Sequence, residues 1–163
     1  KLLKDLKLTS GKYWLTLAGW KSHKNLETLL SAAQKTRQSG CEIPPLVVAA
    51  SPPADGTQYP GVIFLGGLSD SQVNVLLSHA AWLWVPSEYE GFGRPPLEAL
   101  VRGVPVVLSS ITPHREGMAI AGVKTEDSFV RWIAAPKDEN AWIEAMRRAA
   151  SPRPCSPTCV FWR

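Results

Sequence analysis

Short, continuously apolar runs alternate with longer amphipathic segments along most of the chain. Apolar runs of about four to eight residues, without polar alternation, are typical of parallel strands that helices cover on both faces. We expect strands over residues 13–19, 45–50, 61–67, 81–87, 105–110 and 128–134. We expect helices over residues 25–38, 71–80, 95–103 and 140–150. This order predicts an α/β fold built on an open, doubly wound parallel sheet.

Residues that commonly begin or end helices stand at the expected boundaries. Ser69 and Asp70 are suitable caps before the helix at 71–80. Pro95 and Pro96 suit the first turn of the next helix, and Gly103 stands where a glycine often follows a helix. These signals predict a short, sharply bounded helix after residue 94.

Several other features have ordinary structural interpretations. Residues 51–60, SPPADGTQYP, favour a surface loop because they are rich in turn-forming residues. Trp82 and Trp84 lie two apart on one apolar run and are expected in the core. We expect His79 at a helix end and His114 in a loop, both with structural roles.

The size of the chain fits one domain. Its 163 residues, 45% of them hydrophobic, are enough for one core and too few for two. We expect residues 1–150 to form this domain. Residues 151–163 contain three prolines and show neither helical nor strand periodicity, which predicts an irregular tail. The cysteines have no histidine cluster beside them, so we expect no metal site; they are Cys41, Cys155 and Cys159.

Charge and hydropathy restrict the location more than the function. No apolar run approaches the ~18 residues of a membrane span, and the opening residues KLLKDLKL lack the apolar stretch of a signal peptide. We expect no transmembrane segment and a cytoplasmic protein, or one peripheral to the membrane at full length. Residues 1–40 carry eight Lys or Arg against two Asp or Glu. Such a basic edge suits nucleic acid, an acidic membrane or a phosphorylated small molecule, and it can also serve solubility alone.

The stretch PSEYEGFGRPPLEAL, residues 86–100, carries the most chemistry. Gly91 and Gly93 let the backbone approach a ligand, and a helix start provides unpaired amides that favour an anion such as pyrophosphate. Glu98 can accept paired hydrogen bonds from a vicinal diol such as a ribose, and Glu90 can face the group beyond the phosphates. The stretch favours a ligand with phosphate in the middle and hydroxyls at both ends.

Two other interpretations compete with this one. A glycine turn leading into a helix, with Glu98 merely favouring the helix dipole, fits the spacing equally well. A dinucleotide-binding dehydrogenase is less well supported. Its G-x-G-x-x-G motif should follow the first strand, and only WKSHKN follows residues 13–19.

Several motifs together resemble those of the family 4 retaining glycosyltransferases. VPSEYEGFGRPPLEALVRGVPVVLSS resembles the family signature, with its Glu-x7-Glu pair at Glu90 and Glu98. Three further segments resemble the family in the right order: GWKSHKNLETLL, VIFLGGLSDSQVNVLLSHA and APKDENAWIEAMRRA. The resemblance covers roughly residues 13–150. It implies the C-terminal, Rossmann-like half of a GT-B fold, whose active site lies between two such domains.

The resemblance also implies a role for each matching residue. Glu90 would contact the transferred sugar, and Lys24 would neutralise the departing diphosphate, as catalytic residues. Lys21 would substitute for an arginine that the family often carries where this chain has Trp20. The donor-binding residues implied in full are Lys21, Gly91, Phe92, Gly93, Glu98 and Glu116.

The function implied is that of a donor-binding domain. The full-length enzyme would be a retaining, hexosyltransferase-type glycosyltransferase of polysaccharide biosynthesis, working without metal or other cofactor on a nucleoside diphosphate sugar. Its partners would be that donor and a missing N-terminal acceptor domain, and not nucleic acid, so the chain alone is expected to be inactive. A GT-B-like nucleotide-sugar epimerase and a non-catalytic nucleotide-sugar-binding module stay open as alternatives.

Overall fold

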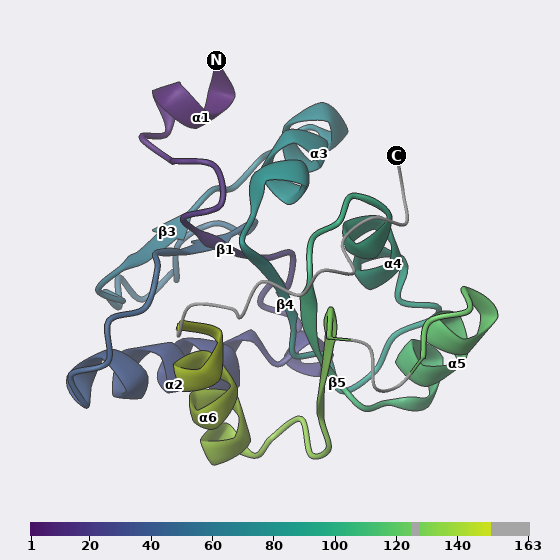
Figure 1. Cartoon of the computed structure of the whole chain (residues 1–163). Coiled ribbons are helices and arrows are strands. Elements are labelled where there is room, and N and C mark those ends of the chain that lie inside the picture. The colour runs from purple at the N-terminus through teal and green to yellow at the C-terminus, as the bar shows by residue number, and fades with distance from the viewer. Residues whose placement is uncertain (125–127, 151–163) are drawn as a thin grey trace.

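A six-stranded parallel sheet forms the centre of the computed structural model, which describes residues 1–124 and 128–150. The strand order is β3-β2-β1-β4-β5-β6. The labelled strands β3, β1, β4 and β5 follow one another in this order in Figure 1. The strands are β1 (Trp14–Thr16), β2 (Leu46–Val48), β3 (Val62–Phe64), β4 (Trp82–Val85), β5 (Val106–Ser109) and β6 (Val130–Ile133). All six expected strands and the doubly wound sheet are confirmed, although each strand is shorter than its apolar run. The expected tail at 151–163, with Cys155 and Cys159, lies outside the described residues.

Helices connect most of the strands. They are α1 (Leu2–Asp5), the 3₁₀ helix η1 (Ser22–Lys24), α2 (Leu26–Gln38), α3 (Asp70–His79), α4 (Arg94–Val101), α5 (Thr112–Ile120) and α6 (Glu139–Ala150). The β2–β3 connection has no helix, as expected for the turn-rich residues 51–60. None of the helices in the described ranges has the length and hydropathy needed to cross a bilayer.

The sheet carries a separate hydrophobic core on each face. Helices α2 and α6 pack side by side over one core (Figure 1), and α3, α4 and α5 cover the other. Along β4, Trp82 and Trp84 face the first core, while Leu83 and Val85 face the second. The two tryptophans are only 2% and 0% exposed, which confirms that they belong to the core. Burial on both faces explains why the strands read as unbroken apolar runs.

The expected helix boundaries are confirmed. The Ser69 hydroxyl accepts a hydrogen bond from the Gln72 amide, and the Gln72 side chain accepts one from the Ser69 amide, which is a reciprocal capping box. Helix α4 has Pro95 in its first turn, and Gly103 follows the helix with φ +72°. This left-handed conformation is one that glycine adopts without strain.

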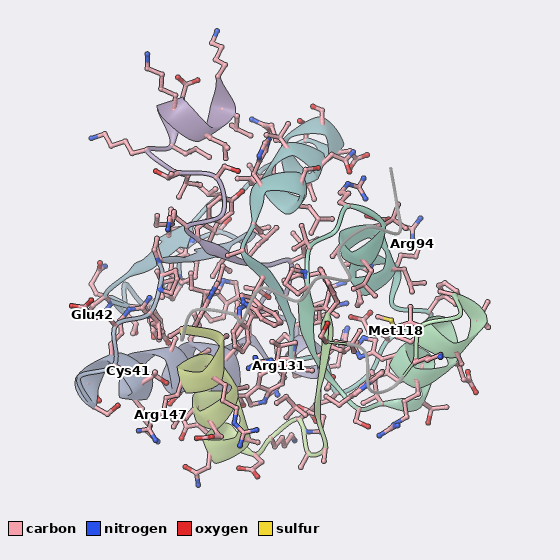
Figure 2. The ribbon with its side chains drawn as sticks, in the orientation of Figure 1. Cys41, Glu42, Arg94, Met118, Arg131 and Arg147 are labelled. Carbon is pink, nitrogen blue, oxygen red and sulfur yellow. The ribbon has the colours of Figure 1, made fainter. Side chains whose placement is uncertain are left out.

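Helix α5 was not expected, and the prediction of a loop at His114 is wrong. The buried residues of α5 are His114, Gly117 and Met118, which lie on one helical face, and Met118 points inward (Figure 2). Histidine and glycine are not counted as hydrophobic residues, so the sequence shows no helical hydrophobic periodicity over α5. Pro113 in the first turn favours the helix start, because its ring fixes φ at a helical value.

Candidate functional site

Two loops leave the carboxyl edge of the sheet at the point where the strand order changes direction. Strand β1 pairs with β2 on one side and with β4 on the other. The loop after β1, residues 17–25, leads to α2 on one face, whereas the loop after β4, residues 86–93, leads to α4 on the opposite face. Such a switch point opens a crevice outside the strands, where open α/β sheets bind ligands. The Glu88 amide donates to the His23 carbonyl at 2.8 Å and ties the two loops together.

Lys24 and Glu90, which lie 66 residues apart in sequence, form an ion pair across these two loops. The Lys24 Nζ lies 2.7 Å from Oε1 and 2.8 Å from Oε2 of Glu90. The Lys24 side chain is 27% exposed and that of Glu90 is 15% exposed, so solvent screens the pair only in part. The structure therefore brings together the two residues that the resemblance implied as catalytic.

Opposing effects set the pKa of Glu90. Burial raises it, but hydrogen bonds from Lys24 and Ser87 and the charges of Lys24 and His114 together outweigh burial. The pKa therefore lies below its ordinary value, and Glu90 is a carboxylate at neutral pH. A fixed anion and a fixed cation thus meet at the switch point.

A chain of buried hydrogen bonds supports Glu90 from behind. The Ser87 hydroxyl donates to Glu90 Oε1 at 2.7 Å, and the Ser109 hydroxyl donates to the Ser87 carbonyl. The Ser109 carbonyl in turn lies 2.8 Å from Nδ1 of His114. Ser87, Ser109 and His114 are 1%, 0% and 2% exposed. Sequence reasoning missed this support because serine is common in loops, and because the contacts depend on the pairing of β4 with β5.

The two glycines of the β4–α4 loop differ. Gly93 has φ +73°, and an added Cβ there would lie 2.6 Å from Cδ2 of His114. Gly91 has no positive φ, and an added Cβ would meet nothing within 4 Å. The fold itself therefore requires glycine at 93, whereas no contact in the structure requires it at 91.

The loop provides backbone amides more than the helix does. Pro95 and Pro96 carry no N–H, so only Arg94 among the first three residues of α4 can donate. No hydrogen bond joins the amides of Gly91, Phe92 or Gly93 to another described residue. The free amides therefore belong to the loop, and the start of α4 offers fewer donors than expected from the sequence.

None of the remaining residues implied by the resemblance contacts this pair through a hydrogen bond or an ion pair in the described part of the chain. Glu98 is half-buried on α4, and its carbonyl accepts from Arg102 at 2.7 Å. Glu116 is exposed on α5. Phe92 is 48% exposed beside the two glycines. Lys21 is exposed and lines a neighbouring pocket.

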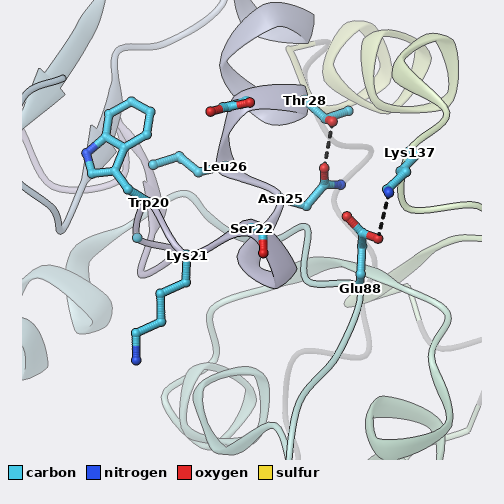
Figure 3. Close-up of a pocket in the computed structure, with 10 residues that line it drawn as sticks. Trp20, Lys21, Ser22, Asn25, Leu26, Thr28, Glu88 and Lys137 are labelled. Atoms are coloured by element: carbon cyan, nitrogen blue, oxygen red, sulfur yellow. Dashed lines mark hydrogen bonds and ion pairs between the residues drawn. The ribbon is translucent and has the colours of Figure 1, made fainter. Parts of the chain in front are cut away.

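This pocket, of about 500 Å³, opens between the β1–α2 loop and the start of α2 (Figure 3). Trp20 and Lys21 stand on one side, and an ion pair between Glu88 and Lys137, 3.2 Å apart, stands on the other. The Trp20 ring stacks on Phe64, with centroids 6.0 Å apart. Lys24 and Glu90 are not among the residues that line the pocket. The pocket therefore does not contain the Lys24–Glu90 ion pair.

Asn25 anchors the end of the β1–α2 loop. It is 8% exposed and adopts a left-handed conformation with φ 53° before α2. Its Nδ2 donates to the carbonyls of Pro86 at 3.2 Å and Pro136 at 2.7 Å, and its Oδ1 accepts from Thr28 at 2.6 Å. Asparagine tolerates this backbone conformation better than most residues do. The sequence analysis did not single out Asn25, because its hydrogen-bond partners at Pro86 and Pro136 are set by the tertiary fold.

No three His, Cys, Asp or Glu side chains among residues 1–124 and 128–150 gather in a way that could hold a metal ion. The arrangement can instead offer a lysine cation, a carboxylate and free loop amides to one ligand. Together these groups suit a molecule that carries both an anionic portion and hydroxyl groups.

Comparisons with known proteins agree on one family. The family model described as "Glycosyl transferases group 1" matches residues 12–151. The O-antigen chain mannosyltransferase B of Escherichia coli is 35% identical over 98 residues, covering 60% of this chain and 26% of the relative. The alpha-1,3/1,6-mannosyltransferase ALG2 of Rhizomucor pusillus is 30% identical over 142 residues, covering 83% of this chain and 29% of the relative. The chain thus spans only about a quarter of the length of these curated relatives.

Solved structures agree on the fold. WaaG, a glycosyltransferase involved in lipopolysaccharide biosynthesis, superposes with a TM-score of 0.70 at 19% identity, covering 91% of this chain and 40% of that one. The sucrose-phosphate synthase of Thermosynechococcus elongatus superposes with a TM-score of 0.66 at 22% identity, covering 90% of this chain and 38% of that one. The sheet is therefore the Rossmann-like unit of GT-B glycosyltransferases.

Proposed function

Because this chain belongs to the group 1 glycosyltransferases, we propose that it is the domain that binds a nucleoside diphosphate sugar in a retaining enzyme. The full-length enzyme would transfer a hexose from that donor to an acceptor without a metal ion. The names of the relatives favour mannose as the hexose. The observation that carries the proposal is the ion pair between Lys24 and Glu90 at the switch point of the sheet.

The ion pair suits the two ends of the reacting bond. Departure of a nucleoside diphosphate develops negative charge on the leaving phosphate, and a cation already in place stabilises that charge. Lys24 would supply the cation. Glu90, held as a carboxylate, would accept hydrogen bonds from the hydroxyls of the sugar beside it. Cation and carboxylate would thus separate to receive the phosphate and the sugar of one donor.

The neighbouring groups extend this assignment along the donor. The amides of Gly91, Phe92 and Gly93 would donate to the diphosphate, because none of them has a partner among the described residues. Glu98, half-buried on α4, would accept from the ribose diol. In each of these roles a buried or backbone group replaces water around a polar ligand.

Two more residues are proposed on weaker geometry. Lys21 is exposed at the rim of the pocket and would add positive charge toward the phosphates. Glu116, exposed on α5, would contact the far side of the sugar. Acceptor binding is assigned to the part of the longer relatives that this chain does not match.

Calorimetric titration tests the proposal with UDP, GDP and ADP, and with UDP-glucose and GDP-mannose. We expect weak but saturable binding of at least one nucleotide, because this chain would supply one wall of the proposed donor site. Failure of all five ligands to bind at millimolar concentration, while circular dichroism shows a folded protein, would contradict the proposal. Incubation with a radiolabelled nucleotide sugar should give no transfer, since the acceptor must be held close to the anomeric carbon.

A second experiment tests the ribose contact. The change Glu98→Gln should weaken nucleotide binding by about 1–3 kcal/mol, the range for hydrogen bonds to a charged group. The loss should disappear with a 2′,3′-dideoxyribose analogue, which lacks the diol. Equal losses with both ligands would remove Glu98 from the ribose site.

A further inference from the structure

The glycine loop that bears Glu90 rests on helix α5 at two places. At Gly93, an added Cβ would lie 2.6 Å from Cδ2 of His114 and 3.2 Å from its Nε2. At Gly117 of α5, an added Cβ would lie 3.3 Å from the Phe92 carbonyl oxygen. Side chains larger than glycine at 93 or 117 would push the loop and the helix apart. The loop and α5 therefore fit together closely where α4 begins.

His114 also connects with Glu90 through hydrogen bonds. The Ser109 carbonyl can only accept, so Nδ1 of His114 carries the proton of the hydrogen bond between them. Ser109 holds the Ser87 carbonyl, and Ser87 holds Glu90 Oε1. The buried imidazole of His114 thus contacts Gly93 of the loop through Cδ2. Through Nδ1 it contacts Ser109, the last residue of the hydrogen-bond chain that supports Glu90.

The charge state of His114 suits this role. Burial and, to a smaller extent, the charge of Lys24 lower its pKa, and together they outweigh the hydrogen bond to Ser109 and the charge of Glu90, which raise it. The ring is therefore neutral at pH 7, with the proton on Nδ1. Its Nε2 has no hydrogen-bond partner within the described part of the chain. The edge of the ring formed by Cδ2 and Nε2 therefore contacts Gly93 by van der Waals packing alone.

We propose that His114 is the positioning residue of this site, which fixes the glycine loop at Gly93 and, through Ser109 and Ser87, the carboxylate of Glu90. The expected effect of His114 on donor binding rests on the proposed function, whereas its effect on the position of Glu90 does not. It makes α5, an element outside both loops, responsible for where the carboxylate stands. His114 itself would touch no ligand.

Two substitutions separate the contacts of the ring. In His114→Asn, the side-chain amide can place Nδ2 near the position of Nδ1 and Oδ1 near that of Cδ2, so both contacts are preserved. In His114→Gln, the polar atoms lie one bond further out, and both contacts are lost. Met118→Ala, on the same helix face but outside the hydrogen-bond chain, serves as the control for simple loss of α5 packing.

The first measurement needs no ligand. Carbon-13 NMR of the Glu90 carboxyl group reports its pKa in each variant. If His114 holds Ser87 in place, His114→Gln weakens the Ser87 hydrogen bond and raises the pKa of Glu90. His114→Asn also removes the direct charge of the ring, which lowers this pKa, so it should raise the pKa less than His114→Gln does. Met118→Ala should leave the pKa at the wild-type value. Equal Glu90 pKa values in folded His114→Gln and His114→Asn variants would overturn the proposal.

The second measurement uses the nucleotide sugar that the wild-type chain binds. His114→Gln should weaken its binding about tenfold, the effect of about one lost hydrogen bond to a charged group, and His114→Asn should restore it. The difference between the two variants should vanish when Glu90 is changed to Gln. A difference that persists without the carboxylate would show that His114 does not act through Glu90.

The two measurements distinguish the failure of this inference from that of the proposed function. If no nucleotide binds to the wild-type chain, the donor assignment fails, while the pKa of Glu90 still reports on His114. If nucleotides bind and all the variants bind them equally, the donor assignment stands and His114 only stabilises the fold. If His114→Gln does not fold, Ser109→Ala breaks the same chain of hydrogen bonds and should raise the Glu90 pKa in the same way.

Discussion

The two loops at the switch point are held in different ways. The β4–α4 loop is attached from beneath by Ser87 and Gly93, which are buried against Ser109 and His114. The β1–α2 loop exposes residues 20–22 and has one buried polar anchor near its end, Asn25. Lys24 lies just before that anchor on a long, flexible side chain and is held by Glu90. The fold therefore positions the carboxylate, and the carboxylate positions the cation.

Gly93→Ala should have the largest effect, because it breaks the better supported loop. Alanine in the left-handed region costs ~1–2 kcal/mol, and the contact with His114 adds overpacking of ~1–3 kcal/mol. Urea denaturation should show the loss as a lower midpoint. Gly91→Ala is the matched control, with open space and no positive φ, and should change stability by less than ~0.5 kcal/mol. Equal losses of stability at the two glycines would show that Gly93 is not held against His114 more closely than Gly91 is held.

Asn25→Ala tests the anchor of the other loop, and we expect a loss of about 2–3 kcal/mol in unfolding free energy. The carbonyls of Pro86 and Pro136 would lose their buried donor, and alanine is strained at φ 53°. Asn25→Gly removes the same hydrogen bonds without the strain, so it should be less destabilising by about 1 kcal/mol. An Ala variant as stable as wild type would show that this loop needs no anchor.

Glu90→Gln tests the dependence of the cation on the carboxylate. Both carboxylate oxygens of Glu90 accept from Lys24, so Glu90 would compete with any anion for that side chain. Removing its charge should strengthen binding of a nucleoside diphosphate about tenfold, the effect of one charge-assisted contact. The affinity difference between the nucleotide sugar and the nucleoside diphosphate should become smaller, because the carboxylate no longer accepts from the sugar. The gain should be absent when Lys24 is also changed to Gln. Unchanged diphosphate affinity in the Glu90→Gln variant would mean that the ion pair does not keep Lys24 from binding an anion.

Lys24→Gln should have the smallest effect on stability, less than ~1 kcal/mol for a partly exposed ion pair. The lowered pKa of Glu90 contributes stability that is present above the unfolded value of 4.5 and is lost as pH falls through the folded value. Without Lys24 the pKa rises, so less stability is lost on acidification. Urea midpoints measured between pH 7 and pH 3 should therefore fall less steeply in the variant than in wild type.

The sequence predicted the sheet well because burial on both faces leaves an unbroken apolar run, as in β4. It did not predict α5, whose buried face consists of His114, Gly117 and Met118. Tertiary packing favours that helix, and apolar periodicity does not reveal it. Strand ends were also placed too far out, since apolar side chains can continue beyond the last ladder hydrogen bond.

At the site, the motif signalled Lys24 and Glu90, and the structure placed them in contact. The support behind them was not visible, because Ser87 and Ser109 meet only when β4 pairs with β5. One correction was available from the sequence itself. Pro95 and Pro96 cannot donate amide hydrogen bonds, so the start of α4 had little to offer an anion.

The central pairing of the sheet also has a kinetic consequence. Only η1 and α2 separate strands β1 and β2 in the sequence, but β1 pairs with β4 only after the chain between Trp14 and Trp82 has closed on itself. Closing so long a segment costs entropy before any contact is gained, which slows folding. We expect a folding nucleus within one half of the chain and late docking of the other half. The proposed nucleotide site takes residues from both halves, so binding followed by stopped flow should then report on the last step of folding.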